Sequence, residues 1–294
     1  MRSMLFVPAD SEKKIGKSLG VGADALILDL EDSVAASNKP QARAMAAAFI
    51  KETRPKAQRP RLYVRINPLD GAFWEDDVTG VIGAQPDGII LPKPNSAADA
   101  DRLALVLDHA EKSKGIAQGQ TRIIAIATET PTAMLTLPTY LGATQRLEGI
   151  TWGAEDLSAV IGSSATRETD GRTWTSPYRL ARDLCLMTAV AAGRQPIDTV
   201  YVNFRDQAGH AEECRIAARD GFTGKMAIHP DLVPAINAAF TPAAEEIAWA
   251  KEIEAMFAAN PNSGALNLRG QMIDRPHQVR AARVLARARM AGLV

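Results

Sequence analysis

The chain has 294 residues, of which 46% are hydrophobic, so it is long enough and apolar enough to bury a large core. Its 34 Lys and Arg residues balance its 34 Asp and Glu residues, and no overall charge draws it to nucleic acid or to an anionic membrane. The composition therefore favours a small-molecule partner, with no nucleic acid and no membrane.

The amino-terminal segment and the two cysteines bear on the compartment. The opening run MRSMLFVPAD reaches Pro8 and Asp10 before an apolar stretch of signal-peptide length develops. No later run approaches the roughly 20 apolar residues that cross a membrane. Cys185 and Cys214 have neither the spacing of a zinc site nor the density of a disulfide scaffold, so we expect buried thiols. These features predict a cytoplasmic protein in a reducing compartment.

Short apolar runs rich in Val, Ile and Leu alternate with longer Ala-rich segments of helical spacing. This alternation is typical of parallel strands joined by helices, and continuous apolar runs suit strands that are buried on both faces. Eight strands are predicted, at residues 3–7, 24–30, 61–66, 88–91, 122–127, 147–152, 198–202 and 224–228. Eight β/α units over about 240 residues match the usual size of a TIM (β/α)8 barrel, an α/β fold. An open doubly wound sheet is the alternative, although the G-x-G-x-x-G turn expected after an early strand does not occur.

The pattern changes after Phe240. Thr241 is placed to cap a helix that begins at Pro242 and ends near Pro261. A polar stretch, NPNSGALNLRGQ, then leads to a basic helix over about 276–291. We therefore predict a barrel domain over residues 1–240 and a C-terminal helical extension over 241–294. The extension is either a packing arm or a lid, exchanged between subunits, that completes a site.

Two acidic residues follow neighbouring predicted strands, Glu129 in ATETP and Asp156 in WGAEDLS. The carboxyl ends of barrel strands meet at one face, where catalytic residues collect. Asp156 could instead be a helix N-cap, whereas Glu caps poorly and Thr130 is the better cap beside Glu129. Two carboxylates that leave positions open for water and substrate suit Mg²⁺. No His-rich ligand set argues for zinc. His229 is expected to have a structural packing role rather than to bind a metal. The sequence predicts Glu129 and Asp156 as Mg²⁺ ligands.

Other charged side chains fall at further strand ends. Arg65 ends the third strand in VRINP, and Lys93 follows the fourth in LPKP. Lys93 would contact the acyl carrier or a carboxylate, or else lie in solvent. A second acidic group is expected to orient metal-bound water or Arg65, although direct ligation by one member stays open; it consists of Asp29, Glu31 and Asp32.

Many short motifs, in order along the chain, resemble those of one known family. They are RSMLFVPAD, DALILDLEDSV, LYVRINP, GIILPKP, the TET and GAEDLS segments, and GFTGKMAIHPDLVPAIN. The set is similar to the citrate lyase β-subunit group of the HpcH/HpaI aldolase family, which includes citramalyl-CoA and malyl-CoA lyases. The resemblance runs from Arg2 to about Ala291. It implies a TIM barrel, in agreement with the strand count.

The resemblance also implies roles for individual residues. Glu129 and Asp156 would bind Mg²⁺, and Arg65 and Glu129 would contact the substrate. RGQMIDRPH resembles the C-terminal segment in which malyl-CoA lyase-like enzymes place a catalytic acid, which gives that role to Asp274. The alternative for Asp274 is an N-cap ahead of Pro276. In relatives this segment reaches over the active site of a neighbouring subunit, which implies a homo-oligomer, a trimer or a multiple of it.

Basic residues near the first βα loop are candidates for contacts with coenzyme A. Arg2, Lys13 and Lys14 are placed where related enzymes meet the coenzyme's phosphates, with ordinary exposed side chains as the alternative. The Gly-Lys-Ser run at 16–18 imitates the end of a P-loop, but Ser11 stands where the first glycine is required. We therefore exclude nucleotide binding there.

The residues and the resemblance together predict an enzyme, a Mg²⁺-dependent carbon–carbon lyase of the oxo-acid-lyase type. Its substrate would be a short hydroxy-dicarboxylyl thioester, such as citramalyl-CoA, malyl-CoA or a citryl thioester, carried by coenzyme A or by an acyl carrier protein. The products would be an acyl thioester and a 2-oxo acid. A thioester hydrolase on the same scaffold and a non-catalytic subunit of a lyase complex are the alternatives. A phosphoryl-transfer enzyme lacks support, because no phosphate-cradling glycine loop occurs.

Overall fold

The computed structural model describes residues 1–294, and its first unit contains a closed barrel of eight parallel strands. Each strand pairs with the next one along the chain, and the first pairs with the eighth through Ser3 and Lys225, so the sheet has no free edge. The strands are β1 (Ser3–Pro8), β2 (Ala25–Asp29), β3 (Arg61–Arg65), β4 (Gly88–Leu91), β5 (Arg122–Ile126), β6 (Leu147–Thr151), β7 (Gln195–Asp198) and β8 (Gly224–Ala227). The predicted TIM barrel is confirmed.

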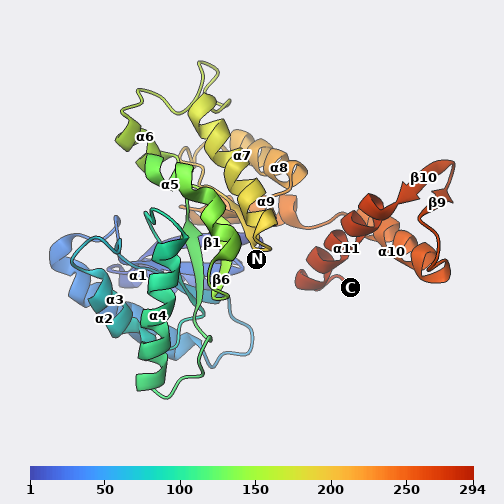
Figure 1. Ribbon diagram of the computed structural model, residues 1–294. Helices are drawn as coiled ribbons and strands as arrows, with labels where there is room; N and C mark the ends of the chain where they lie inside the picture. Colours follow the sequence, from blue (N-terminus) through green and yellow to red (C-terminus); the bar gives the residue numbers. More distant parts are fainter. The chain divides into compact units, whose positions relative to one another are not determined.

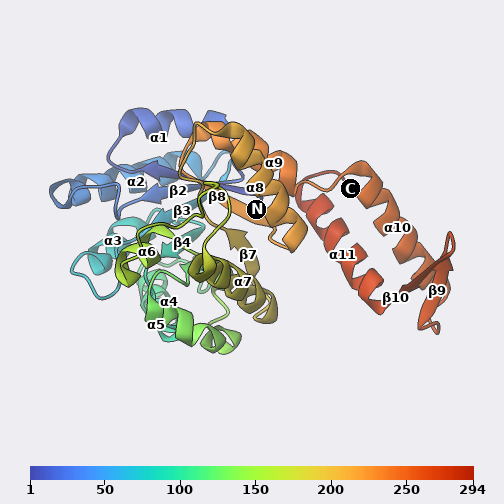
Figure 2. The same ribbon diagram turned by 90° about the horizontal axis from the view of Figure 1, so that it is seen from above.

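Helices surround this barrel (Figures 1 and 2). They are α1 (Glu12–Ser18), α2 (Lys39–Thr53), α3 (Trp74–Ile82), α4 (Ala97–Ser113), α5 (Pro131–Thr136), α6 (Glu155–Ile161), α7 (Ser176–Ala191), α8 (Gln207–Asp220) and α9 (Val233–Phe240). Local signals explain several starts: Thr130, Ser96 and Asp206 each accept a backbone N–H in the first turn of the helix that follows. No helix combines the length and the apolar character needed to cross a bilayer.

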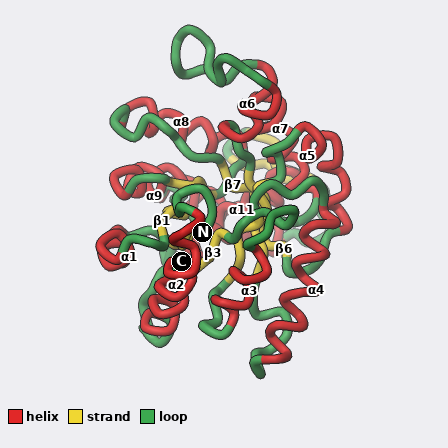
Figure 3. Tube along the Cα trace, turned by 90° about the vertical axis from the view of Figure 1, so that its left-hand side faces the viewer, coloured by secondary structure: helices red, strands yellow, loops and turns green.

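Alternate strand residues fill the barrel, whose strands lie inside the ring of helices (Figure 3). Strand side chains point to opposite faces in turn, and here both faces are buried, which is why the sequence reads as continuous apolar runs. The interior cluster consists of Met4, Ala25, Ile27, Tyr63, Ile90, Ile124, Ile126, Ile197 and Met226. The interior is therefore packed core, and the strand ends are left for function.

The seventh strand lies earlier than predicted. We expected residues 198–202, but the strand is Gln195–Asp198, and Pro196 pairs with Ile150 of β6. The error has two causes. Pro196 lacks an N–H and argues against a strand, whereas the β-branched and aromatic residues after Asp198 imitate one. Strand β8 pairs no further along β7 than Asp198, so Tyr201 and its neighbours form a loop.

Three residues that could have carried chemistry have structural surroundings instead. Cys185 and Cys214 are free and buried, as predicted. Burial raises the pKa of both thiols, that of Cys214 to about 12, so neither is a ready nucleophile. The ring of His229 stacks on Phe204 with centroids 4.5 Å apart, in agreement with a packing role.

The second unit comprises Asn237–Val294, so the division falls within α9, slightly before the boundary predicted after residue 240. It contains α10 (Ala244–Ala259), an antiparallel hairpin of β9 (Ala265–Leu268) and β10 (Gln271–Asp274), and α11 (Arg275–Met290). Its own core includes Ile253, Phe257, Ile273, Val284 and Leu285.

Two expectations for this unit are corrected. Thr241 does not cap α10, which begins two residues after Pro242. The Thr241 hydroxyl donates instead to the carbonyl of Asn237. The polar stretch at 260–271, for which no strand was predicted, contains β9, the turn and the first residue of β10. Arg269 and Gly270 form the two-residue turn, both with positive φ (52° and 83°), as the commonest hairpin turns require.

Candidate active site

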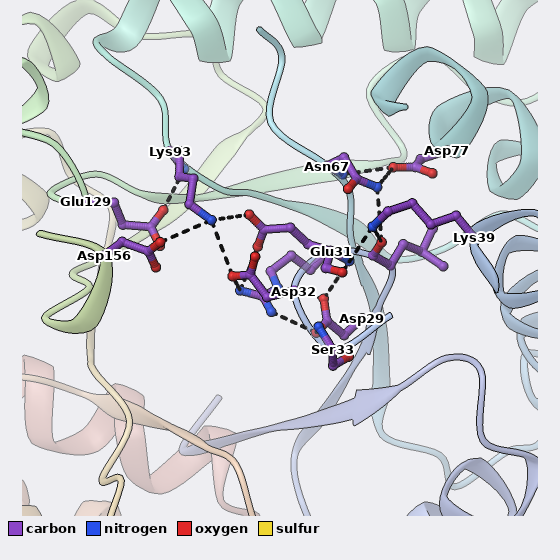
Figure 4. Close-up of polar contacts among 12 residues, drawn as sticks. Asp29, Glu31, Asp32, Ser33, Lys39, Asn67, Asp77, Lys93, Glu129 and Asp156 are labelled. Carbon is purple, nitrogen blue, oxygen red and sulfur yellow. Dashed lines mark hydrogen bonds and ion pairs between the residues drawn. The ribbon is translucent and has the colours of Figure 1, made fainter. Parts of the chain in front are cut away.

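The carboxyl ends of five neighbouring strands, β2 to β6, bring most of the predicted site residues together (Figure 4). They line a cavity of about 420 Å³ whose walls include Asp29, Arg65, Glu129 and Asp156. The strands are parallel, so residues that follow them collect at the same end of the barrel. The cavity lies wholly within the first unit.

Arg65 is fixed by two acidic residues of the β2 end. Its Nε and Nη2 lie 2.7 Å from the two carboxylate oxygens of Asp29, and its Nη1 lies 2.8 Å from Oε2 of Glu31. Burial would raise the pKa of Asp29, but the Arg65 guanidinium outweighs burial and holds that pKa below its ordinary value. The ring of Phe6 lies 4.8 Å from the centre of the guanidinium. The orientation of Arg65 is thereby set before any substrate arrives.

Lys93 joins the two acidic groups. Its ammonium contacts Glu31, lies 3.3 Å from Asp32 and lies 3.2 Å from Asp156 (Figure 4). Burial opposes the charge, yet neighbouring carboxylates, Glu31 first and then Glu129 and Asp156, hold the pKa of Lys93 above its ordinary value. Of the alternatives for Lys93, the structure shows contact with carboxylates, which belong to this chain, and not a lysine free in solvent. A contact with the acyl carrier stays a prediction.

Glu129 and Asp156 face the same part of the cavity. Glu129 is 2% exposed, and burial, reinforced by the charge of Asp156, raises its pKa well above the ordinary value. The backbone N–H of Lys93 donates to Oε2 of Glu129 at 2.5 Å. Asp156 is the second residue of α6 and Ala154 holds the N-cap position, so the alternative reading of Asp156 as a cap is wrong.

This pair has the chemistry of a divalent-cation site. A buried carboxylate beside a second one is costly, and a cation between them would offset both the burial and the repulsion. No group of three or more His, Cys, Asp or Glu side chains is arranged around a common point. A cation held by Glu129 and Asp156 would therefore take its remaining positions from water and substrate, which is the habit of Mg²⁺. The residues fit Mg²⁺.

Two residues that support the site were missed in the sequence. Nζ of Lys39 donates to the carbonyls of Leu30 and Glu31, at 2.8 and 3.1 Å. Nδ2 of Asn67 also donates to the carbonyl of Leu30, and it is itself held by Asp77. The loop that carries the second acidic group is thus anchored from α2 and from the end of β3. Asn67 follows a strand end directly, so the rule that identified Arg65 could have found it.

The basic residues proposed for coenzyme A separate into two places. Arg2 precedes β1, and its Nη2 lies 2.7 Å from Oδ1 of Asp24, just before β2. That is the amino-terminal end of the barrel, opposite the cavity, so the placement of Arg2 at the first βα loop is wrong. Lys13 and Lys14 are exposed on the first turn of α1, which follows β1. The Gly-Lys-Ser run at 16–18 forms the last three residues of that helix and no phosphate loop.

Asp274 lies in the second unit, at the end of β10 and at the N-cap position of α11. Its Oδ1 is 2.6 Å from Nδ1 of His277, a neighbour that was not singled out in the sequence. His277 stands three residues after Asp274, one helical turn along, so the spacing alone indicated the contact. The position at the helix start agrees with the N-cap alternative, and a chemical role for Asp274 stays a prediction.

Comparison with known proteins places these features in context. The family model for HpcH/HpaI aldolase/citrate lyase matches residues 2–230. The citrate lyase subunit beta of Leuconostoc mesenteroides subsp. cremoris is 33% identical over 296 residues, which cover 100% of this chain and 95% of that protein. The mitochondrial citramalyl-CoA lyase of Homo sapiens is 31% identical over 287 residues, covering 94% and 82% respectively.

Solved structures show the same likeness. CitE of Mycobacterium tuberculosis, in complex with magnesium, acetoacetate and coenzyme A, has a TM-score of 0.76 and 33% identity, covering 98% of this chain and 99% of that one. A citrate lyase from Burkholderia xenovorans LB400 has a TM-score of 0.85 and 26% identity, covering 99% and 92%. The similarity therefore extends over both units of the chain.

Proposed function

Because the chain belongs to the HpcH/HpaI aldolase/citrate lyase family, whose relatives above are lyases, we propose that it is a Mg²⁺-dependent carbon–carbon lyase. Its substrate is a short hydroxy-dicarboxylyl thioester such as citramalyl-CoA, malyl-CoA or a citryl thioester. The observation that carries the proposal is the convergence of Glu129, Asp156 and Arg65 on one cavity.

Glu129 and Asp156 hold the Mg²⁺. When bound, the cation acts as a Lewis acid and template for the hydroxyl and carboxylate of the fragment that becomes the 2-oxo acid. Both carboxylates must be ionised to serve as ligands, so the raised pKa of Glu129 describes the pair without its cation. Support also comes from the magnesium complex of the similar CitE structure.

Cleavage must manage two charges. The substrate hydroxyl releases its proton to solvent and becomes a carbonyl, the bond between C2 and C3 breaks, and the electron pair of that bond remains on the thioester fragment as an enolate. Arg65 is permanently charged and offers a planar fork of donors, so it stabilises the enolate oxygen or a substrate carboxylate. Asp29 and Glu31 hold that fork in place, which avoids reorganisation during the reaction.

Asp274 supplies the proton that the enolate carbon requires. It stands in a separate unit from the cavity, so we propose that the second unit of a neighbouring subunit acts as a lid over the site and that the enzyme is a homo-oligomer, a trimer or a multiple of it. Exposed apolar side chains on α7, Leu180, Leu184 and Met187, offer a surface for such a contact.

Lys13 and Lys14 remain candidates for the phosphates of coenzyme A. The free cysteines suit a reducing compartment, and we propose the cytoplasm.

The assay that tests the proposal offers malyl-CoA and citramalyl-CoA to the protein with Mg²⁺. The expected products are acetyl-CoA together with glyoxylate or pyruvate, and a chelator should abolish them. Release of free CoA without a 2-oxo acid would identify a thioester hydrolase and refute the lyase. The chain would be a non-catalytic subunit if it were inactive alone but supported the activity of a lyase complex. In that case the Glu129→Ala variant should support the complex equally well.

A further inference from the structure

A buried polar contact joins three neighbouring strands on the outer side of the barrel wall. Trp152, directly after β6, donates its indole Nε1–H to Oδ1 of Asp198 on β7 at 2.8 Å. Nζ of Lys225 on β8 lies 2.6 Å from Oδ2 of the same carboxylate. None of the three residues is more than 1% exposed. Asp198 therefore links β6 to β8 without contact with solvent.

The contacts continue until they return to Trp152. Nζ of Lys225 lies 2.9 Å from Oε1 of Glu213 on α8, and Oε2 of Glu213 lies 2.7 Å from Nη2 of Arg167. The Arg167 guanidinium lies 3.2 Å from the ring centroid of Trp174, and the Trp174 ring meets the Trp152 ring edge to face at 5.0 Å. We call this closed set the Trp152 circuit; its members are Trp152, Asp198, Lys225, Glu213, Arg167 and Trp174.

The circuit is balanced in charge, with two carboxylates and two cations. Lys225, with Arg182, holds the pKa of Asp198 below its ordinary value against the effect of burial. Buried ion pairs of this kind are often no more stabilising than apolar residues of the same volume, because desolvation offsets their attraction. What they add is a defined orientation, since each partner has a fixed hydrogen-bond geometry.

Trp152 connects the circuit to the candidate active site. Trp152 is among the residues that line the cavity, and the next residue, Gly153, packs against Glu129 so closely that a Cβ there would come within 2.8 Å of Glu129 Cγ. Asp156 follows three residues after Gly153. The position of the Trp152 backbone therefore governs both the space for Glu129 and the approach of Asp156.

We propose that Asp198, through the indole of Trp152, is a positioning residue that sets the spacing of Glu129 and Asp156 for the metal. The inference rests on the proposed function, because it concerns the same pair of carboxylates. Neither Asp198 nor Lys225 contacts the cavity, so their effect is exerted through the β6 end.

Trp152→Phe tests this inference, since it keeps an aromatic ring and removes the N–H that Asp198 accepts, together with part of a buried indole. A control must therefore lose the same buried volume. We expect Mg²⁺ affinity, measured by calorimetry without substrate, to fall by about tenfold, as for other groups that orient metal ligands. We expect kcat to fall and the KM for the thioester to change little. Trp74→Phe is the matched control, because Trp74 is also buried beside an arginine, Arg102, but lies on α3 outside the circuit. Its Mg²⁺ affinity should equal that of the wild type.

A double-mutant cycle with Asp198→Ala, which removes the acceptor, separates positioning from general loosening. If both residues act through one hydrogen bond, the double variant should lose no more Mg²⁺ affinity than the more affected single variant. Unchanged affinity in a folded Trp152→Phe protein, or losses that add independently, would overturn the inference while leaving the lyase proposal intact. Glu129→Ala serves as the control without Mg²⁺ binding. If the wild type also bound no Mg²⁺, the proposed function would be overturned, and the inference with it.

Discussion

Arg65 uses three of its nitrogens on protein carboxylates, two on Asp29 and one on Glu31. A lysine keeps the charge but cannot reproduce this fork. For Arg65→Lys we expect kcat/KM to fall by about a hundredfold, since removal of an oriented donor to a developing anion costs roughly 3 kcal/mol. Steady-state kinetics with the thioester provides the measurement.

Arg59→Lys is the matched control for that change. Arg59 also makes a two-pronged ion pair, with Asp87, but at the amino-terminal end of the strands. Its kcat/KM should stay within about twofold of the wild type. Equal losses in both variants would show that Arg65 acts through stability rather than through the site.

His210 makes stability depend on pH. It is fully buried on α8, and burial, with the nearby charge of Lys225, lowers its pKa from 6.5 to about 4. Between these values the unfolded chain takes up a proton that the folded chain refuses, so the stabilisation from neutral His210 is present above pH 6.5 and is lost as pH falls toward 4. Lowering the pH to about 4.5 should therefore remove roughly 2–3 kcal/mol through this residue.

His210→Gln removes the titrating ring and should flatten that dependence. Urea unfolding of both proteins at neutral pH and near pH 4.5 gives the difference in free energy of unfolding. The gap between wild type and variant should shrink, or reverse, on acidification. A gap that stays constant would mean that His210 can be protonated without unfolding.

At the scale of the elements, the close approach of β4 to β3 requires glycine at position 88. A Cβ there would come within 2.5 Å of Tyr63 Cε1 and 2.9 Å of the Arg122 carbonyl, and neither neighbour is free to move. Gly88→Ala should therefore lower the free energy of unfolding by about 1–3 kcal/mol and Tm by several degrees. In Gly83→Ala the added methyl would meet nothing within 4 Å, so this control should unfold like the wild type.

Helices and strands could be predicted from the sequence wherever a run of apolar residues indicates that the element is buried. The run at Ala25–Asp29 is apolar throughout and buried on both faces, so its strand was found. Strand β7 was misplaced because pairing with β8, rather than residue type, decides where it ends. The hairpin after α10 was missed because Arg269 gives no warning that it adopts positive φ before Gly270.

The candidate site divides in the same way. Glu129 and Asp156 were found because a parallel barrel gathers residues at its strand ends, a rule that needs only the order of elements. The pairing of Lys93 with Asp156 depends on side-chain directions across three strands, which a sequence does not contain. Arg2 was misplaced for a related reason, because a residue before a strand belongs to the opposite end from a residue after it.

At the scale of the whole molecule, the proposal divides the site between two units of the chain, with Glu129 in one and Asp274 in the other. If the lid comes from a neighbouring subunit, Glu129→Ala and Asp274→Ala chains complement each other when they share an assembly. Each working site then needs a barrel from the Asp274→Ala chain and a lid from the Glu129→Ala chain. Random assembly of equal amounts supplies this combination in about one quarter of sites.

Co-expression followed by purification through two different tags keeps only the mixed assemblies, and in a mixed trimer one site in three has the working combination. The purified protein should therefore show about a third of the wild-type kcat, whereas each variant alone is inactive. Two wild-type copies that carry the two different tags, co-expressed and purified in the same way, control for the effect of the tags. A lid that serves its own barrel predicts the opposite, because every chain then lacks one of the two carboxylates. Mixed assemblies without activity would assign Asp274 to the barrel of its own chain, and a monomeric, fully active wild type would exclude the exchange altogether.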